Sequence, residues 1–335
     1  MDDGIDFETA LRAAIDGKTK PPGSLGRLEA LAARIARLQG SLAPRMERCR
    51  LTIFAADHGI AAEGVSAFPQ AVTRQMLQNF LAGGAAANVL ARAVGAEVAV
   101  VDAGVAGALV DHPDLVSRRI GPGTANAAAG PAMTAAEAAE ALAAGRAIGA
   151  ESPGEAAAFG DMGIANTASA TLVLAKLTGL PPAGIAGRGT GLDDAGLARK
   201  RAVLARAAAR TPARLDPETA LAEYGGFEIA MMTGAMLGAA GARKLVLVDG
   251  FIATAAAAAA TALAPASEAA LVFAHRSAEA GHAPVLARLG AEPLLDLDMR
   301  LGEGTGALLA WPIVGAAAAM LREMASFESA GVSRQ

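Results

Sequence analysis

The chain has 335 residues, of which 29 are basic and 33 acidic, so its formal net charge is −4. A dedicated nucleic-acid binder would carry a basic surplus, and this sequence has none. The one cysteine, Cys49, excludes an intramolecular disulfide and a cysteine-based zinc site.

Hydrophobic residues make up 53% of the chain, a share that would suit a membrane protein. Much of this share is alanine, which contributes little to insertion into a bilayer. The most apolar stretch, Phe251–Ala266, falls short of the roughly 20 strongly apolar residues that a spanning helix needs. The acidic N-terminus does not resemble a signal peptide. We therefore expect a cytoplasmic protein with neither membrane nor nucleic-acid partners.

The two ends of the chain differ from its middle. Residues 5–40 have the periodicity of amphipathic helices around the loop Lys20–Gly26, and a further apolar helix is predicted over Ala307–Ala325. We expect these ends to pair in a small helical domain made of residues 1–40 and 307–335. Residues 41–306 would then form a large substrate-binding domain.

In the middle of the chain, short apolar runs alternate with alanine-rich segments of helical length. Each run leads into glycine or polar residues, as expected of strands buried on both faces of a parallel sheet. The predicted strands are Leu51–Ala56, Glu97–Val101, Ala156–Phe159, Leu245–Val248, Ala270–Ala274 and Pro293–Leu297. The predicted helices are Val72–Val94, Thr134–Gly149, Thr167–Leu177, Gly196–Ala209, Glu228–Ala242 and Phe251–Leu263. This alternation predicts an open, mostly parallel α/β sheet with helices on both faces, whose ligands bind beyond the carboxyl ends of the strands.

Two glycine-rich loops are candidates for binding an anion. Gly160–Thr167 is a strand-to-helix turn whose backbone N–H groups would suit a phosphate, although Asn166 or Thr167 could instead be a simple N-cap. Gly187–Asp194 is followed by Arg199 and Lys200, a combination that suits an anionic ligand or a surface turn before a capped helix.

Glu303 stands between two glycines after the last predicted strand. Burial there would raise its pKa enough for work as a general base, whereas the simpler interpretation is a carboxylate at the start of a helix. His58 and His275, at strand ends, are expected to orient groups or contact substrate. The four histidines, His58, His112, His275 and His282, show no short metal-ligand spacing, so we expect no metal.

Eight motifs, in order from about residue 20 to residue 320, resemble one family, the nicotinate-nucleotide–dimethylbenzimidazole phosphoribosyltransferases. They are KPPGSLG at Lys20–Gly26, ADHGI at Ala56–Ile60, EGVSAFPQAVT at Glu63–Thr73, GDMGIANT at Gly160–Thr167, GRGTGLDD at Gly187–Asp194, VDGFIAT at Val248–Thr254, AHRSAEAGH at Ala274–His282 and RLGEGTGA at Arg300–Ala307. The resemblance implies a homodimer, a Rossmann-like large domain and no cofactor. It also implies transfer of 5-phosphoribosyl from nicotinate mononucleotide to 5,6-dimethylbenzimidazole, giving α-ribazole 5′-phosphate and nicotinate for cobamide assembly.

The same resemblance implies roles for particular residues. Glu303 would be the general base, and Asp161 would give electrostatic support. Nicotinate mononucleotide would be bound by Gly163, Asn166, Thr167, Gly189, Lys200 and Ser277. The base would lie near Ser66, Phe68, Gln75 and Leu301.

The sequence departs from the family pattern within one turn. Where the family normally has GEMGIGNT, this chain has Asp161 in place of glutamate and Ala165 in place of glycine. The aspartate is one methylene shorter, and the alanine is strained if its φ is positive.

Other functions are open on the sequence. The same reaction on another benzimidazole, a purine or a phenol fits the motifs equally, and a non-catalytic nucleotide-binding homologue is a further possibility. A dinucleotide-dependent oxidoreductase is disfavoured because no GxGxxG follows the first predicted strand.

Overall fold

The computed structural model describes residues 6–333 and contains a parallel sheet of six strands in the order β3-β2-β1-β4-β5-β6. The strands are β1 (Cys49–Ala56), β2 (Glu97–Gly104), β3 (Leu115–Ser117), β4 (Ala156–Met162), β5 (Leu245–Val248) and β6 (Leu271–Phe273). All five neighbouring pairs are parallel. This is the strand order of the doubly wound Rossmann fold, and it confirms the predicted architecture.

Alternate residues of each strand point to opposite faces of the sheet. On β4, Ala157 and Phe159 belong to one buried cluster, whereas Ala156 and Ala158 belong to the other. Burial on both faces explains why these strands appear in the sequence as continuous apolar runs. Strands β1 and β4 lie side by side, and the chain leaves them toward opposite halves of the sheet. The topological switch point therefore lies between these two strands.

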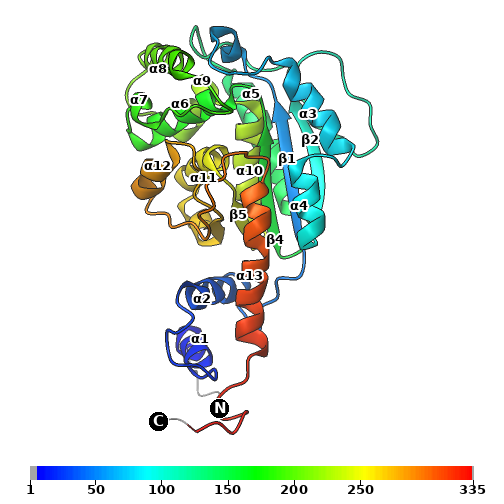
Figure 1. Ribbon diagram of the computed structural model, residues 1–335, viewed down its shortest axis with the longest axis vertical. Coiled ribbons are helices and arrows are strands. Elements are labelled where there is room, and N and C mark those ends of the chain that lie inside the picture. The colour runs from blue at the N-terminus through cyan, green and yellow to red at the C-terminus, as the bar shows by residue number, and fades with distance from the viewer. Residues whose placement is uncertain (1–5, 334–335) are drawn as a thin grey trace.

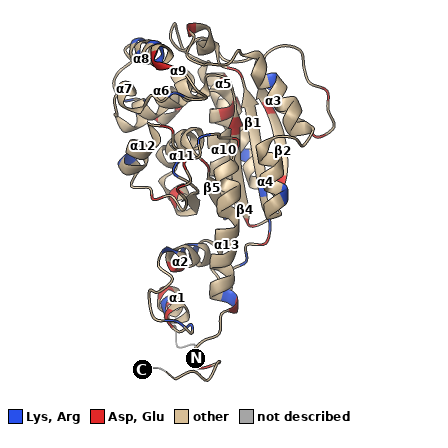
Figure 2. Cartoon of the chain, in the orientation of Figure 1, with Lys and Arg blue, Asp and Glu red and all other residues tan. Residues whose placement is uncertain are grey.

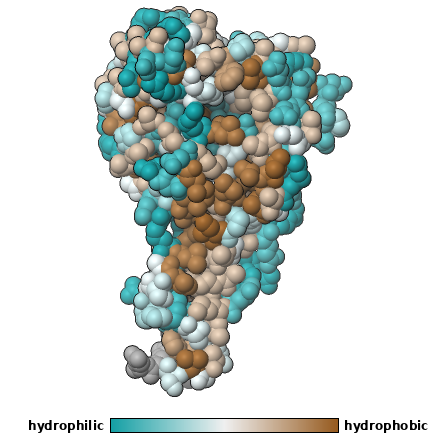
Figure 3. All heavy atoms as spheres, in the orientation of Figure 1, coloured by the Kyte–Doolittle hydropathy of each residue, from teal (hydrophilic) through white to brown (hydrophobic). Residues whose placement is uncertain are grey.

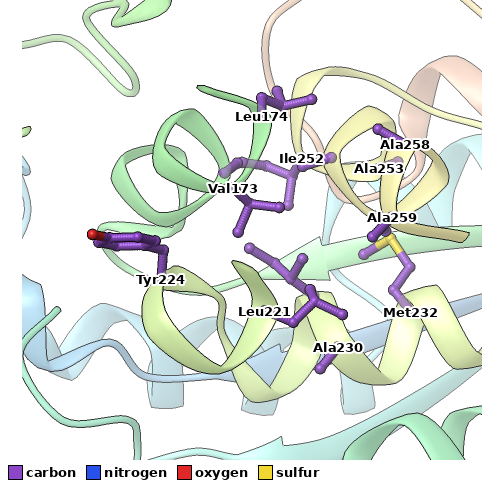
Figure 4. Packing of buried hydrophobic residues seen from close by; sticks show 14 of the residues in the cluster. Val173, Leu174, Leu221, Tyr224, Ala230, Met232, Ile252, Ala253, Ala258 and Ala259 are labelled. Carbon is purple, nitrogen blue, oxygen red and sulfur yellow. The ribbon is translucent and has the colours of Figure 1, made fainter. Parts of the chain in front are cut away.

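Five helices from the middle of the chain cover the first face. This layer contains α5 (Ala135–Glu151), α6 (Asn166–Thr178), α9 (Pro217–Tyr224), α10 (Phe227–Gly241) and α11 (Phe251–Leu263). Figure 4 shows side chains of α6, α9, α10 and α11 meeting there, among them Val173, Leu221, Met232 and Ile252. Small residues let these helices approach closely, since a Cβ on Gly145 of α5 would lie 1.8 Å from the Met231 carbonyl oxygen of α10. Three further helices, α7 (Pro182–Ile185), α8 (Asp194–Ala208) and α12 (His282–Leu289), pack at the side of this layer (Figure 1).

The opposite face is covered by α2 (Arg27–Gln39), α3 (Ala71–Leu81), α4 (Ala86–Val94) and α13 (Thr305–Glu323). Figure 1 shows α13 running along the sheet and then past its edge to lie beside α1 (Phe7–Asp16) and α2. Two short 3-10 helices, Gly59–Glu63 and Pro265–Ala270, complete the elements. Figure 2 shows that α13 carries charge only at its end, where Arg322 and Glu323 lie.

The two ends of the described chain are hydrogen-bonded to each other. The backbone N–H of Thr19 donates to the Ala325 carbonyl oxygen over 3.0 Å, and Lys18 Nζ donates to the Met324 carbonyl oxygen over 2.6 Å. Leu11, Ile35 and Leu321 belong to the same buried cluster as the sheet-facing residues of α13. That these terminal helices form a separate domain with a boundary near residues 40 and 307 stays a prediction.

Three sequence-based expectations of secondary structure were wrong. Residues 72–94 form two helices, α3 and α4, because the chain turns at Gly83 (φ 76°) and Gly84. Pro293–Leu297 forms no strand, and only Leu295 makes an isolated bridge, with His275. The edge strand β3 was not predicted.

Within residues 6–333, α13 is long and apolar enough to cross a membrane by length and composition. Of its most apolar window, 61% is buried inside the structure. Burial of this kind is typical of a core helix, and here it results from packing of α13 on α2, α4 and the sheet.

Candidate active site

The candidate site lies at the carboxyl ends of β4, β5 and β6, beside the switch point. A pocket there is lined by six of the groups that follow these strands or begin the next helix: Asp161, Asn166, Thr167, Asp249, His275 and Ser277. Gly189, Glu279, Arg300, Leu301 and Gly302 complete most of its wall. A smaller hollow adjoins it and is lined by Ser66, Gly163, Ile164 and Ala165, with Asn166, Thr167 and Gly189 shared between the two. The sequence-predicted loops therefore converge.

Glu303 directly follows Gly302 of this pocket wall, does not itself line the pocket, and has an unusual backbone conformation. It has a φ of 62° and is preceded and followed by Gly302 (φ 83°) and Gly304 (φ 81°), so three consecutive residues are left-handed. A left-handed conformation costs a residue with a side chain roughly 1–2 kcal/mol. Strain of this kind persists only where the surroundings fix it, and it is common at functional sites.

The Glu303 side chain is buried, and within residues 6–333 its Oε2 atom has no hydrogen-bond partner. Burial raises the pKa of this carboxyl group to about 7, with a backbone hydrogen bond from Ala87 acting against the rise and the nearby Asp249 carboxylate adding to it. Ala87 is in the first turn of α4, so Glu303 faces the start of that helix and not of its own helix α13. A carboxyl group with a pKa near 7 and a free oxygen is suited to accept a proton at neutral pH.

Asp161, near the end of β4, faces the same pocket. Its Oδ2 accepts a hydrogen bond from Asn166 Nδ2 over 2.8 Å, and a Cβ on Gly302 would lie 3.4 Å from both carboxyl oxygens. Burial raises the pKa of Asp161 well above its usual value, and the carboxylates of Asp249 and Glu228 raise it further. Three acidic groups, Asp161, Asp249 and Glu303, thus meet here, and burial raises the pKa of each.

The Gly160–Thr167 turn does not use its polar residues as helix caps. The N-cap of α6 is Ala165, which has a φ of 75° and no capping side chain. Asn166 instead bonds Asp161, and Thr167 Oγ1 accepts a hydrogen bond from Lys200 Nζ over 2.7 Å. Both side chains thus serve the pocket. In the Gly187–Asp194 loop, by contrast, Asp193 does cap α8, accepting from the Gly196 N–H over 2.7 Å.

Lys200 is a cation that lies behind this pocket wall. It is fully buried behind Thr167 and Gly189, and burial lowers its pKa to about 8 while Glu279 acts to raise it. Glu279 Oε1 in turn accepts a hydrogen bond from the Gly189 N–H over 2.9 Å. A phosphate on this wall would favour the charged lysine, since an opposite charge stabilises the ionised form.

Ser277 is held by a chain of hydrogen bonds. Its backbone N–H donates to His282 Nδ1 over 2.8 Å, and His282 Nε2 lies 2.9 Å from Thr254 Oγ1. Because Nδ1 accepts, Nε2 carries the proton and donates to the threonine. Burial lowers the pKa of His282 to about 3, so the ring is neutral and the arrangement is fixed.

The predicted base-binding residues are not all brought together. Ser66 lines the smaller hollow. Leu301 lines the pocket at the strand ends, and 54% of this leucine is exposed. Phe68 is 48% exposed on the loop before α3, and Gln75 is exposed on α3; neither lines the two hollows. Their contact with a base stays a prediction.

The two strand-end histidines have different places. His275 lines the pocket, as expected of a group that contacts substrate, and neither ring nitrogen has a hydrogen-bond partner. His58 is fully buried away from the pocket lining, with Nδ1 2.9 Å from Ser169 Oγ and Nε2 2.6 Å from Glu228 Oε1. Contact of His58 with substrate is therefore not supported by its position.

A larger hollow, of about 600 Å³, lies between α5, α9 and the loop before α5. Its wall is mostly apolar, and two of its three carboxylates are already paired: Glu137 accepts from Thr134, and Glu223 bonds Arg210. Without convergent free polar groups, it is a weaker candidate for chemistry than the strand-end pocket. Among residues 6–333, no group of three or more His, Cys, Asp or Glu side chains is arranged to hold a metal ion.

Comparison with known proteins agrees with this geometry. Residues 5–332 match a family model described as a phosphoribosyltransferase. A relative from Ralstonia nicotianae, named nicotinate-nucleotide–dimethylbenzimidazole phosphoribosyltransferase, is 57% identical over 97% of this chain and 93% of its own length. A relative of the same name from Variovorax paradoxus is 55% identical over 97% of this chain and 93% of its own.

The chain belongs to the nicotinate-nucleotide–dimethylbenzimidazole phosphoribosyltransferase family. The crystal structure of CobT from Thermus thermophilus is similar over 98% of this chain and 99% of that one, with a TM-score of 0.95 and 49% identity. The motif resemblance and the fold predicted from it are thereby confirmed.

Sequence reasoning missed several residues of this family member's pocket. Asp249, Glu279 and Arg300 line it, and Arg300 also donates a hydrogen bond to the Gly189 carbonyl oxygen over 2.9 Å. Asp249 carried a usable signal, because it directly follows a predicted strand. Glu279 and Arg300 lie within two of the motifs, but only the folded chain brings them to Gly189.

Proposed function

We propose that this chain transfers the 5-phosphoribosyl group from nicotinate mononucleotide to 5,6-dimethylbenzimidazole, releasing nicotinate and α-ribazole 5′-phosphate for cobamide assembly. The observation that carries the proposal is the buried Glu303 carboxyl group, with a pKa of about 7 and a free oxygen, beside a pocket built from the family's motifs. Full-length relatives of more than half identity carry the name of this activity.

The chemistry needs few groups from the protein. Nicotinate on C1′ is a pyridinium, so it leaves with the electrons of the C1′–N bond. Its ring thereby becomes neutral without an acid. One nitrogen of the benzimidazole attacks C1′ from the opposite face, which inverts β to α. Positive charge then grows on the attacking ring, and Glu303 takes the proton from its other nitrogen. Holding the two substrates in line supplies much of the remaining acceleration.

We assign the phosphate and ribose to the wall formed by Gly163, Asn166, Thr167, Gly189 and Ser277, with Lys200 behind it. Lys200 supports this assignment because it is a buried cation that bonds only Thr167 among the hydrogen bonds of the described residues. We assign the base to the side of Ser66 and Leu301, with Phe68 and Gln75 as further contacts.

We also propose that the protein is a homodimer in the cytoplasm. In support, an apolar surface runs along α13 and α4 (Figure 3). Both helices have apolar side chains that are exposed or half-buried, among them Val89 and Leu90 of α4 and Leu309 and Ile313 of α13. A continuous apolar face of this kind is typical of a protein interface. It begins near Glu303, because α4 supplies the Ala87 N–H that Glu303 contacts.

The test is product analysis after incubation of the purified chain with nicotinate mononucleotide and a panel of benzimidazoles, purines and phenols. We expect α-ribazole 5′-phosphate and nicotinate in equal amounts with dimethylbenzimidazole. Glu303→Gln should lose most turnover and still bind the base, because the amide keeps the shape but does not accept the proton. A faster reaction with a purine or phenol would reassign the base, and no transfer to any acceptor would refute the proposal.

A further inference from the structure

Helix α13 begins without a capping side chain of its own. Its N-cap is Gly304, which has a φ of 81° and no side chain. The cap comes from Asp249, at the end of β5 and more than fifty residues earlier in the chain. Asp249 Oδ1 accepts from the Ala307 N–H over 3.0 Å, and Oδ2 accepts from the Gly304 N–H over 3.3 Å. The carboxyl group thus binds both ends of the first turn.

The turn that Asp249 binds is the one that carries Glu303. Gly304 directly follows Glu303, and the Thr305 hydroxyl donates back to the Gly302 carbonyl oxygen over 2.8 Å. Three left-handed residues in succession would relax toward ordinary conformations if nothing held them. Asp249, itself only 1% exposed, holds this segment from its C-terminal side.

His275 completes the arrangement from the end of β6. Its Nε2 lies 3.8 Å from Asp249 Oδ1, and its ring is enclosed by two glycines. A Cβ on Gly306 would lie 1.9 Å from the His275 ring, and one on Gly250 would lie 3.1 Å from Nε2. The ring therefore has a fixed place beside the carboxylate. Burial raises the pKa of Asp249, and the charge of the His275 ring acts against that rise and favours the ionised form.

We propose that Asp249 is a positioning residue, which fixes the Gly302–Gly304 turn and so aims the Glu303 carboxylate at the base to be activated. The inference rests on the proposed function of Glu303. It differs from a purely structural cap in one respect: the Asp249 carboxylate also acts on Glu303 through its negative charge, which lies close enough to affect the Glu303 proton.

Other titratable groups act on the same cluster. Asp161 faces Glu303 and Asp249 from β4, Glu228 acts on Asp161 from α10, and His275 lies beside Asp249. A change at Asp249 therefore reaches Glu303 both directly and through Asp161. The sign of the direct effect is clear: loss of a negative charge near Glu303 makes its proton easier to remove.

The test compares Asp249→Asn with Asp57→Asn. Asp57 is a second buried aspartate at a strand end, where it accepts from the Ala106 N–H over 2.8 Å and does not contact the turn. We expect Asp249→Asn to lower kcat about 10- to 100-fold, as a displacement of about 1 Å does, with a KM for nicotinate mononucleotide within about threefold of the parent. The acidic limb of its kcat/KM profile should move to lower pH. Asp57→Asn should leave that limb in place.

An unchanged acidic limb in Asp249→Asn, or a loss of kcat no larger than in Asp57→Asn, would overturn the proposal. If Asp249→Asn does not unfold cooperatively, His275→Gln provides the second variant. It leaves the two hydrogen bonds to the turn in place and removes the ring that acts against the raised pKa of Asp249, so that Asp249 carries less negative charge. Less negative charge beside Glu303 makes its proton easier to remove, so we then expect the ratio of kcat at pH 6 to kcat at pH 8 to rise at least about threefold. An unchanged ratio would contradict the inference. Failure of the parent enzyme itself to form product would instead refute the proposed function.

Discussion

Gly160 of β4 lies directly against the peptide bond that joins Glu303 to Gly304. A Cβ built on Gly160 would lie 2.5 Å from the Glu303 carbonyl carbon and 2.7 Å from the Gly304 nitrogen. Because the atoms it would meet are backbone, they do not move aside as a flexible side chain does. Because Gly160 has no side chain, the turn that carries the proposed base Glu303 packs directly against β4. The hydrogen bonds to Asp249 hold the same turn.

We therefore predict that Gly160→Ala displaces the Glu303 turn. Overpacking of a core typically costs about 1–3 kcal/mol of stability, and a shift of about 1 Å at a reacting group can cost about 100-fold in rate. Steady-state kinetics and urea unfolding would measure both effects. Gly130→Ala is the matched control, since a Cβ there would meet nothing within 4 Å. Parent-like turnover in Gly160→Ala would show that the turn tolerates displacement.

The activity should depend on pH through Glu303. A general base must be ionised, and the pKa of this carboxyl group is about 7. We expect kcat/KM to fall about tenfold per pH unit well below pH 7 and to level off above it. Residual activity of Glu303→Gln should lack this limb. An acidic limb that is the same in the variant and the parent would assign the titration to another group.

The same carboxyl group should make the folded state less stable at high pH. Its pKa is about 7 in the folded chain and near 4.5 when unfolded, so the folded state binds this proton more tightly. Stability is therefore lost as the pH rises from about 4.5 to 7, by roughly 3 kcal/mol in all. Glu303→Gln should be more stable than the parent at pH 8 and little changed at pH 5, in urea unfolding at one protein concentration. An equal difference at both pH values would contradict the linkage.

Ala165 is a second place where the backbone is strained. It has a φ of 75°, where the family pattern normally has glycine, and it is buried at the start of α6. We predict that Ala165→Gly stabilises the fold by up to about 1 kcal/mol, because glycine adopts this conformation without a steric penalty. Ala168→Gly in the same helix should instead lose about 1 kcal/mol. Thermal unfolding of the two variants would show the opposite signs, and a loss of stability in both would show that Ala165 is not strained.

The burial of each strand explains which parts of the sheet could be predicted from the sequence. Buried parallel strands leave an unmistakable apolar run, so β1, β4 and β5 were placed within a few residues. The edge strand β3 has only three residues, of which two are exposed, and gave no such signal. Leu294 and Leu295 wrongly indicated a strand, because they pack on the core from a loop.

The site was predictable where motifs carried it and not where the fold assembled it. The positive φ of Ala165 and Glu303 depends on what packs around them, which the sequence does not state. In the same way, Asp249 and Gly304 are far apart in the chain. Asp249 caps α13 only because the fold brings the end of β5 to the start of that helix. The roles of the pocket residues stay predictions, which the variants above test.

Asp161 is the remaining departure from the family pattern. Its carboxyl group is buried, accepts a hydrogen bond from Asn166, and has a pKa raised well above the usual value by that burial. Burial thus disfavours the ionised form in the free enzyme, whereas a bound pyridinium would favour it, because opposite charges attract. If that ionised form supports the transition state, its loss should be felt in the rate and not in the fold.

We accordingly predict that Asp161→Asn folds at least as stably as the parent at pH 8 and that its kcat/KM is lower. A charge-assisted hydrogen bond is worth roughly 1.5–3 kcal/mol, which corresponds to about a ten- to hundredfold loss. Asp161→Glu should be tolerated or improve the rate, because Gly302, which faces the Asp161 carboxyl group, has no side chain to block the longer group. A Cβ on Gly302 would lie 3.4 Å from the Asp161 oxygens. Steady-state kinetics on both variants decides the role. Unchanged kcat/KM in Asp161→Asn would mean that the carboxyl group only holds Asn166 in the turn, since an amide oxygen accepts that hydrogen bond equally well.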